Sequence, residues 1–344
     1  MRKHLNTLYA TTEGALLRKD GENIVMDVDR QERARIPIHM LEGLVCFGRI
    51  GVSPQLLGHC MTHGVGVTYL SPQGRFYARV EGPVSGNVLL RRAQYRASDD
   101  PRACAAVVRN LLAGKIHNQR AVLARGWRDR GERLPDRDAF RHAMQRLRRI
   151  PLRLLQEQDV AVLRGLEGEA AQAYFGVFDQ LIAIEHADMR FRGRNRRPPR
   201  DAINAVLSFL YTLLTHDCRS ALETVGLDPA VGFLHRDRPG RPSLALDLAE
   251  EFRPLLGERL ALTLVNRRQI GPGDFRHADG GAVTLTDDAR KTVLVAYQER
   301  KREEVLHPFL GEKAAIGVLP YLQAQSLARH LRGDLDAYPP FLWK

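Results

Sequence analysis

The chain has 344 residues, of which 44% are hydrophobic, and its formal net charge is +12 with a pI of about 9.9. This length allows two domains with sizeable cores, and the lack of any apolar run of about 18 residues excludes a predicted membrane-spanning helix. The N-terminus shows no apolar stretch typical of a secretion signal, so we expect a cytoplasmic protein. The basic charge favours a polyanionic partner, most simply nucleic acid, although an arginine-rich proteome would produce the same excess.

Residues 1–84 are predicted to form a β-rich domain. The expected strands are short, partly alternating and separated by turn signals such as Asp20-Gly21, and they cover residues 4–10, 15–18, 24–28, 44–47, 65–70 and 74–80. Ser53-Pro54 is typical of a helix start, with serine as the cap and proline at the first helical position. It predicts one short helix that ends near His63.

Beyond Gly82-Pro83 the hydrophobic pattern takes a helical period. The predicted helices cover residues 87–97, 101–130, 137–159, 161–183, 201–225, 244–256 and a stretch from 287 to about 331. Residues 271–282 are glycine-rich and are expected to form a loop. The tail, 334–344, has no helical pattern and either docks or stays free. We therefore predict an α+β fold with a β-rich N-terminal domain, 1–84, and an all-α C-terminal domain, 85–344.

The cysteines lie far apart in the sequence and form no Cys-x-x-Cys pair; they are Cys46, Cys60, Cys104 and Cys218. This spacing argues against a thiolate zinc site and against a disulfide framework. We expect all of them to be buried free thiols.

Glu167 heads an otherwise apolar face of a predicted helix. The same face continues with Ala170, Ala171, Tyr174 and Phe178. A glutamate buried on such a face needs a metal ion or an arginine as its counter-charge. The alternative is an exposed glutamate that lies beside Glu169 in the first turn of the helix.

Two further segments carry candidate ligands. His235 lies in the loop-like stretch 232–240, where a neutral imidazole can be a metal ligand or a general base, although a lone loop histidine is usually just exposed. Asp247 and Glu250 are three residues apart, so one helix face can carry both. Glu251 borders the apolar stripe of the same helix, and periodicity does not choose between it and Glu250. A solvated acidic edge is the alternative for this segment.

Two carboxylates and a histidine from separate segments suit Mn²⁺ or Mg²⁺ better than a metal that prefers thiolates. Such an ion lowers the pKa of an attacking hydroxyl and stabilises charge on the departing oxygen, while arginines bind the phosphates. The combination with a basic chain predicts metal-assisted phosphoryl transfer on nucleic acid.

Basic segments supply candidate phosphate contacts. Residues 190–200 hold six arginines in eleven positions, just before a predicted helix: Arg190, Arg192, Arg194, Arg196, Arg197 and Arg200. A mobile, solvated loop is the alternative for this segment. A second cluster comprises Arg141, Arg146, Arg148 and Arg149. Weaker candidates share part of another predicted helix, and they are Arg109, Lys115, Asn118 and Gln119.

These motifs resemble those of the CRISPR-associated endonuclease/integrase family, the catalytic subunit of the spacer-acquisition complex, almost from end to end. Gly165-Leu-Glu-Gly-Glu-Ala-Ala-Gln-Ala-Tyr-Phe175 is similar to the family's Gly-x-Glu-Gly…Ala-x-x-Tyr-Phe motif. Ser243-Leu-Ala-Leu-Asp-Leu-Ala-Glu-Glu-Phe-Arg-Pro254 is similar to its Ser-Leu-x-x-Asp-Leu-x-Glu-x-Phe-Arg-Pro motif. His235 stands where the family places its histidine.

Two other segments add to the resemblance. Arg197-Pro-Pro-Arg-Asp-Ala-Ile-Asn-Ala205 is similar to the family's Arg-x-Pro-x-Asp-x-Val-Asn-Ala segment, with Ile203 in place of the valine. Leu5-Asn-Thr-Leu-Tyr-Ala-Thr-Thr-Glu-Gly14 and Pro37-Ile-His-Met-Leu41 resemble the type I-C branch. Jointly the motifs are highly specific, although no single one would be.

The resemblance implies a β-rich domain that dimerises and contacts DNA, followed by a helical catalytic domain. It implies a homodimer that joins a small ferredoxin-like CRISPR-associated protein in a heterohexamer. The family's metal ligands carry over onto Glu167, His235 and Glu250, with Asp247 as a supporting acidic neighbour, and the ion is Mn²⁺ or Mg²⁺. The implied reaction is attack by the 3′-hydroxyl of a short prespacer DNA on a phosphodiester at the leader–repeat junction.

Two alternatives come from other classes. One is a basic scaffold that binds DNA without chemistry, although carboxylates repel phosphate unless a cation is present. The other is an unrelated metal-dependent nuclease that acts on RNA. The sequence leaves open the prespacer motif and length, the metal used in the cell, the DNA contacts of the N-terminal domain and the need for a separate end-trimming nuclease.

Overall fold

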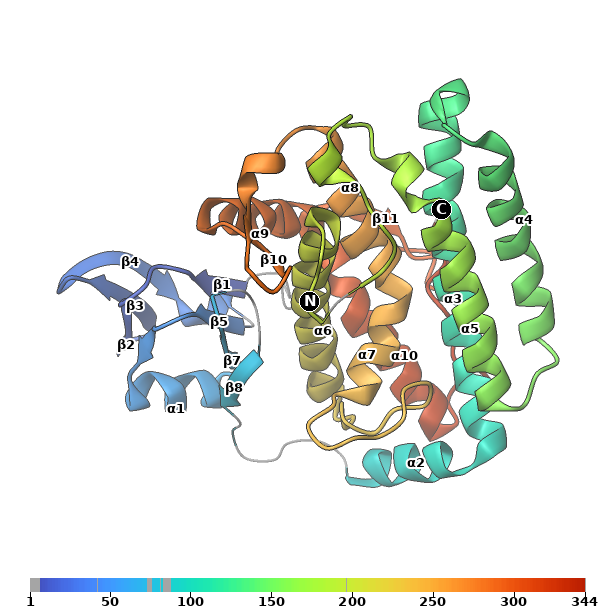
Figure 1. Ribbon diagram of the computed structural model, residues 1–344. Coiled ribbons are helices and arrows are strands. Elements are labelled where there is room, and N and C mark those ends of the chain that lie inside the picture. The colour runs from blue at the N-terminus through green and yellow to red at the C-terminus, as the bar shows by residue number, and fades with distance from the viewer. Residues whose placement is uncertain are drawn as a thin grey trace. The chain divides into compact units, whose positions relative to one another are not determined.

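The structure, a computed structural model, describes residues 7–41, 43–72, 76–80, 82, 88–195 and 197–343. The chain forms two compact units, Met1–Ser85 and Gly86–Lys344, and each is described by itself (Figure 1). Strands dominate the first unit and helices the second, which confirms the predicted mixed α+β character. In the described ranges, no helix combines the length and the apolar character needed to cross a membrane.

The strands of the first unit are β1 (Thr7–Ala10), β2 (Leu16–Asp20), β3 (Asn23–Val28), β4 (Gln31–Pro37), β5 (Gly43–Phe47), β6 (Gly51–Val52), β7 (Gly66–Leu70) and β8 (Phe76–Val80). They form two sheets (Figure 1). One has the order β1-β5-β7-β8, in which β1, β5 and β7 are parallel and β8 is antiparallel to β7. The other has the order β4-β3-β2-β6, in which only the β2–β6 pair is parallel.

The predicted short helix is present as α1 (Pro54–Thr62), and it contacts strands of both sheets, β2 and β7. Ser53 Oγ accepts a hydrogen bond from Leu56 N at 3.3 Å, and Pro54 takes the first helical position, as the sequence predicts. The buried face of α1 packs into a core that is shared with both sheets and that includes Leu17, Leu44, Leu56, Cys60 and Val67.

Two strands of this unit are absent from the prediction, β4 and the two-residue strand β6. β4 lies at the edge of its sheet, and its first three side chains, Gln31, Glu32 and Arg33, are exposed. A strand with so little buried surface shows no clear alternation of apolar and polar residues. Charged side chains on an edge strand also discourage pairing with another chain. Residues 4–6 and 74–75 of the predicted strands lie outside the described residues.

The helices of the second unit are α2 (Val88–Asp99), α3 (Pro101–Arg130), α4 (Arg137–Leu154), α5 (Val160–Gly176), α6 (Ala202–Val225), α7 (Ser243–Phe252), α8 (Arg259–Asn266), α9 (Asp287–Arg302) and α10 (Leu319–Arg332). The long helix α3 packs against α4, α5 and α7, and α6 packs against α7 and α10 (Figure 1). This arrangement gathers α3, α5 and α7, which carry the candidate ligands and their partners, around one interior.

The prediction of an all-α C-terminal domain is wrong in one respect. β9 (Phe275–His277) pairs with β10 (Val283–Leu285), and β11 (Glu304–Leu306) pairs with β12 (Lys313–Ala315), both antiparallel. The first hairpin occupies the segment predicted as a loop, 271–282, and the second separates α9 from α10. Strands of three residues are too short to give a readable alternation.

Two predicted helices also extend beyond their true ends. α4 stops at Leu154 instead of residue 159, and the carboxylate of Asp159 caps the start of the next helix, α5. α5 stops at Gly176 instead of residue 183. The apolar period continues past this end because Phe178 and Leu181 are buried from a 3₁₀ turn.

α7 does not end in a loop but continues through a π-helical stretch, Arg253–Glu258, into α8. Pro254 has no N–H group to donate to the helix ladder, and a wider turn accommodates the missing bond. The predicted helix 244–256 therefore forms the first part of a longer continuous helical segment, which runs from α7 to α8. All four cysteines are buried and free, as expected.

The C-terminal tail docks on α3, α7 and α10. Glu251 accepts hydrogen bonds from Tyr338 Oη at 2.6 Å, from Phe341 N at 2.7 Å and from Gln323 Nε2 at 3.0 Å. Asn118 donates to the carbonyl oxygens of Glu251 and Phe341, at 2.8 and 3.0 Å. Burial raises the pKa of Glu251 to about 8, although these donors offset part of the effect.

We expect Glu251→Ala to lower the free energy of unfolding by about 2–4 kcal/mol, because it leaves Tyr338 Oη and Phe341 N, both buried donors, without their acceptor. Glu132→Ala, at an exposed position, should change it by less than about 0.5 kcal/mol. Chemical denaturation measured by circular dichroism tests both variants. Equal stability of the two would show that the tail contributes nothing to the fold.

Candidate active site

Glu167 lies in the middle of α5, on the side that faces α3. Its carboxylate pairs with the ammonium of Lys115, and 29% of its side chain is exposed. The alternative of a free glutamate beside Glu169 in the first turn of a helix is wrong. Glu169 points to a different partner, since it pairs with Arg153 at 2.7 Å.

Lys115 is a buried cation that joins two of the predicted ligands. It lies on α3, and its Nζ is 2.7 Å from Glu250 Oε2 while it also contacts Glu167. The expectation that Lys115, Asn118 and Gln119 touch nucleic acid is therefore wrong. All three are buried, and Asn118 binds the C-terminal tail instead.

Glu250 is the buried centre of the site. Only 3% of its side chain is exposed, and its carboxylate contacts Lys115, the guanidinium of Arg253, and His235 Nε2 at 3.9 Å. Burial alone would raise the pKa of Glu250, but the charges of Arg253, Lys115 and His235 outweigh it and bring the pKa to about 2. Glu250 is therefore ionised at neutral pH, as a metal ligand must be.

Asp247 holds the loop that carries His235. Its Oδ2 accepts hydrogen bonds from Phe233 N at 2.6 Å and Leu234 N at 3.0 Å, and its Oδ1 accepts from His235 N at 2.9 Å. The same Oδ1 lies 2.6 Å from His235 Nδ1. The ring is thereby oriented with its other nitrogen, Nε2, toward Glu250, which is the arrangement that carboxylates give to metal-binding histidines.

Two more residues fix this loop. Arg164 of α5 donates from Nε to Leu234 O at 2.6 Å. Gly232 allows the loop to approach α7, because a Cβ at this position would come within 2.8 Å of Ser243 Cβ and 2.9 Å of Asp247 Oδ2. The loop-like stretch predicted from the sequence is confirmed, but its histidine is half-buried and fixed.

Glu250 and Glu251 face in different directions. Glu250 faces His235 and Lys115, whereas Glu251 faces the C-terminal tail. Asp247, Glu250 and Glu251 are all buried, so the alternative of a solvated acidic edge is wrong. Glu250 therefore lies beside the other candidate ligands and Glu251 does not, and metal binding by Glu250 stays a prediction.

The residues present fit a divalent cation. Glu250 Oε2 is buried against the Lys115 ammonium at 2.7 Å, His235 Nε2 lies 3.9 Å from the other oxygen of the same carboxylate, and the candidate ligand atoms are carboxylate oxygens and an imidazole nitrogen. The ligand atoms of Glu167, His235 and Glu250 do not all lie within 4.8 Å of one another. The Lys115 ammonium lies between the two glutamates and supplies the positive charge there.

The arginine-rich segment behaves as two groups. Arg190, Arg192, Arg197 and Arg200 are exposed. Arg194 is half-buried, and it donates a hydrogen bond to Asn204 Oδ1 at 2.6 Å. Its guanidinium lies 5.0 Å from the centre of the Tyr211 ring, and the guanidinium of Arg253 lies 4.8 Å from the centre of the same ring.

Arg194 is therefore occupied by internal contacts that a phosphate would have to replace. Arg196 lies outside the described residues. Among the other basic candidates, Arg109 donates to Glu157 O at 2.7 Å, whereas the second cluster is exposed on α4 and comprises Arg141, Arg146, Arg148 and Arg149. Nucleic-acid contact by the exposed arginines stays a prediction.

We expect Asp247→Asn to loosen the 233–235 loop, because the amide nitrogen of asparagine cannot accept the hydrogen bonds that one carboxylate oxygen now accepts. Amide hydrogen exchange of residues 233–235 should become at least about tenfold faster, which corresponds to about 1.4 kcal/mol of lost local stability. Asp237→Asn is the control, since Asp237 accepts only one long bond, from Gly232 N at 3.3 Å. Unchanged exchange in Asp247→Asn would contradict the role given to Asp247.

Comparisons with known proteins agree with the resemblance seen in the sequence. The family model described as CRISPR associated protein Cas1 matches residues 8–299. A protein named CRISPR-associated endonuclease Cas1 2, from Rhodospirillum rubrum, is 61% identical over 347 residues and covers 100% of both chains. One named CRISPR-associated endonuclease Cas1 1, from Chlorobaculum tepidum, is 55% identical over 344 residues, again with 100% of both chains covered.

Solved structures show the same fold. A Cas1 protein from Thermotoga maritima has a TM-score of 0.80 and 22% identity, covering 95% of this chain and 97% of that chain. A casposase bound to integration product has a TM-score of 0.83 and 21% identity, covering 99% of this chain and 95% of that chain. The type I-C branch stays a prediction. The match over most of the sequence and the high identity to full-length relatives show that the chain belongs to the CRISPR associated protein Cas1 family.

Proposed function

We propose that the chain is a metal-dependent DNA integrase and endonuclease of CRISPR adaptation. It would insert a short prespacer DNA at the leader–repeat junction, where a 3′-hydroxyl of the prespacer attacks a phosphodiester. A new P–O bond forms, the old P–O bond breaks, and the departing strand leaves with a free 3′-hydroxyl. Relatives named endonucleases and the fold shared with a casposase bound to integration product support this chemistry.

The observation that carries the proposal is the buried carboxylate of Glu250 between His235 and the Lys115–Glu167 pair. We propose that Glu167, His235 and Glu250 hold Mn²⁺ or Mg²⁺. When bound, such an ion lowers the pKa of the attacking hydroxyl and stabilises charge on the phosphate and on the departing oxygen. Asp247 acts one step away, because it orients the imidazole of His235 and the loop that carries it.

The positive residues of the site divide the remaining work. Lys115 and Arg253 keep Glu250 ionised in an interior that would otherwise protonate it. The exposed arginines Arg190, Arg192 and Arg197 can neutralise the phosphates of bound DNA, and the net charge of +12 favours binding of any duplex. We expect a homodimer that joins a small ferredoxin-like partner in a heterohexamer; a solved Cas6-RT-Cas1–Cas2 complex contains a chain of this fold.

The direct test is strand joining. A labelled short duplex with free 3′-hydroxyls is incubated with a supercoiled plasmid that carries a leader and a repeat, in the presence of the small partner and either Mn²⁺ or EDTA. Joining should occur only with Mn²⁺. Glu167→Ala should join at least about 100-fold more slowly, which corresponds to about 2.7 kcal/mol of lost transition-state stabilisation.

Glu169→Ala is the matched control, since Glu169 lies on the same helix but pairs with Arg153 outside the site. It should join DNA at the rate of the original protein. Metal-dependent joining by Glu167→Ala at the same rate would support the integrase activity but would contradict the assignment of Glu167 to the active site. Tight DNA binding without joining by any variant would favour the basic scaffold, while family membership already makes an unrelated RNA nuclease wrong.

A further inference from the structure

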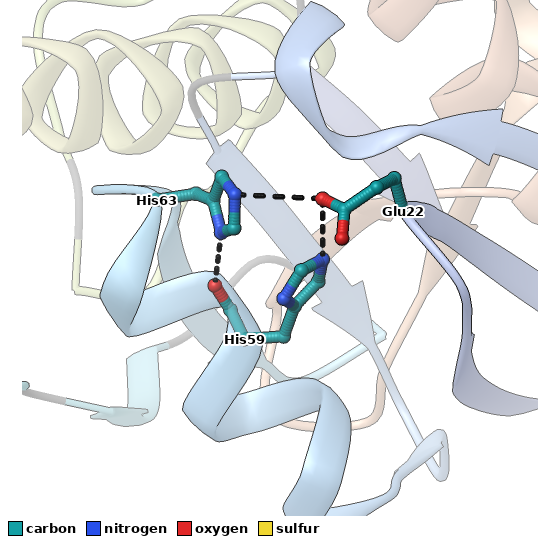
Figure 2. Close-up of side chains that lie close together, drawn as sticks. All are labelled: Glu22, His59 and His63. Carbon is teal, nitrogen blue, oxygen red and sulfur yellow. Dashed lines mark hydrogen bonds and ion pairs between the residues drawn. The ribbon is translucent and has the colours of Figure 1, made fainter.

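A second group of potential metal ligands lies in the first unit, apart from the residues proposed for catalysis. Figure 2 shows Glu22, His59 and His63 with their polar atoms directed at one another. One oxygen or nitrogen of each residue lies within 4.8 Å of those of the other two. Within the described ranges, this is the one set of three such residues that comes so close together.

The distances suit a shared cation better than direct hydrogen bonds. Glu22 Oε2 is 3.5 Å from His59 Nε2 and 3.6 Å from His63 Nε2. These separations exceed the usual range of an N–H···O hydrogen bond, about 2.7–3.2 Å. Around a tetrahedral zinc ion with bonds of about 2.0–2.1 Å, neighbouring ligand atoms are about 3.3–3.4 Å apart. The two distances from Glu22 are therefore close to those that the ion requires, and the third separation is below 4.8 Å.

His63 is held in the tautomer that a metal needs. Its Nδ1 lies 2.9 Å from the carbonyl oxygen of His59, which can only accept, so Nδ1 carries the proton. The lone pair is then on Nε2, the atom that faces Glu22. A hydrogen bond from the distal ring nitrogen to a carbonyl is the usual support of a histidine that binds zinc.

His59 supplies an independent indication of a missing partner. Its side chain is only 9% exposed, and its Nε2 is buried without a hydrogen bond. A buried polar atom in this state costs free energy unless something binds it. Its ring lies edge-on to that of His63, with centroids 4.3 Å apart, so both rings are fixed on one side of the helix end.

The backbone holds all three residues in place. His59 and His63 are four residues apart at the end of α1, so they lie on one face. Glu22 lies in the two-residue turn between β2 and β3, where Gly21 has a φ of 57°. The carbonyl oxygen of Glu22 accepts a hydrogen bond from Ile38 N at 2.9 Å. The ligands therefore come from two rigid elements whose ends meet at this point.

We propose that Glu22, His59 and His63 form a zinc site that links the C-terminal end of α1 to the β2–β3 turn. Two imidazoles and one carboxylate favour Zn²⁺ over Mn²⁺ or Mg²⁺, in agreement with the order of affinities for nitrogen ligands. Glu22 is 70% exposed and His63 is 36% exposed, which leaves a fourth position open to water. Bound there, the ion would fasten the end of the helix to the turn of the sheet.

The test is calorimetric titration of the full-length, chelator-stripped protein with Zn²⁺. His63→Gln should lose one zinc-binding event. Glu22→Gln should weaken zinc binding at this site by more than roughly 10–100-fold, which is the loss caused by removing a residue that only supports a metal ligand. His39→Gln is the control, because His39 is an exposed histidine of the same unit. It should bind zinc as the original protein does.

Two further variants make the outcome decisive. Glu250→Gln should retain this event, which separates it from any binding at the proposed active site. Glu22→Gln changes an exposed turn residue, so it should fold even if a histidine variant does not, and circular dichroism checks this. Zinc binding that is the same in His63→Gln, Glu22→Gln and the original protein would overturn the proposal.

Discussion

The carboxylate of Glu250 has to be neutralised, because an unpaired charge in a protein interior costs several kcal/mol. Lys115 from α3 and Arg253 from the end of α7 both contact it, and Lys115 also contacts Glu167 on α5. Arg253 in turn lies 4.8 Å from the Tyr211 ring on α6. The buried charge of Glu250 thus links four helices. These helices meet around Glu250, and this meeting brings the candidate ligands close together.

The three acidic residues of α7 have three different tasks. Asp247 accepts the backbone amides of the histidine loop, Glu250 faces the cations and His235, and Glu251 anchors the tail. One residue along an α-helix turns the side chain by about 100°, which separates the last two although they are adjacent in the chain. Carboxylates that look alike in the sequence therefore differ in environment, and burial raises the pKa of Glu251 while cations lower that of Glu250.

Capped helices and the ligand motifs could be predicted from the sequence. The helix starts at Ser53 and Asp201 follow from side chains that accept backbone N–H groups. The sequence pattern assigns Lys115 to nucleic-acid contact, although Lys115 follows Leu111 and Leu112 at i+4 and i+3 on the buried face of α3. That spacing is a usable signal, since a lysine in an apolar stripe needs an acidic partner.

Other features depended on contacts that no local pattern contains. The inward turn of Arg194 onto Tyr211 and the docking of the tail on Glu251 join segments far apart in the chain. The meeting of Glu22 with His59 and His63 depends on how the β2–β3 turn reaches the end of α1. Periodicity identifies which face is buried, but it does not identify the partner on the other side.

The proposed metal site at Glu250 is best tested by Mn²⁺ binding to Lys115→Met, measured by calorimetry on the full chain. Because Lys115 supplies positive charge between the two glutamates, its removal should tighten Mn²⁺ binding by at least about tenfold, a conservative figure for the loss of one nearby charge at an effective dielectric constant of about 20. Glu250→Gln identifies the binding that belongs to this site, since it should abolish that binding. Equal or weaker Mn²⁺ binding by Lys115→Met would contradict the proposal that Glu167 and Glu250, which Lys115 now contacts, hold the metal ion.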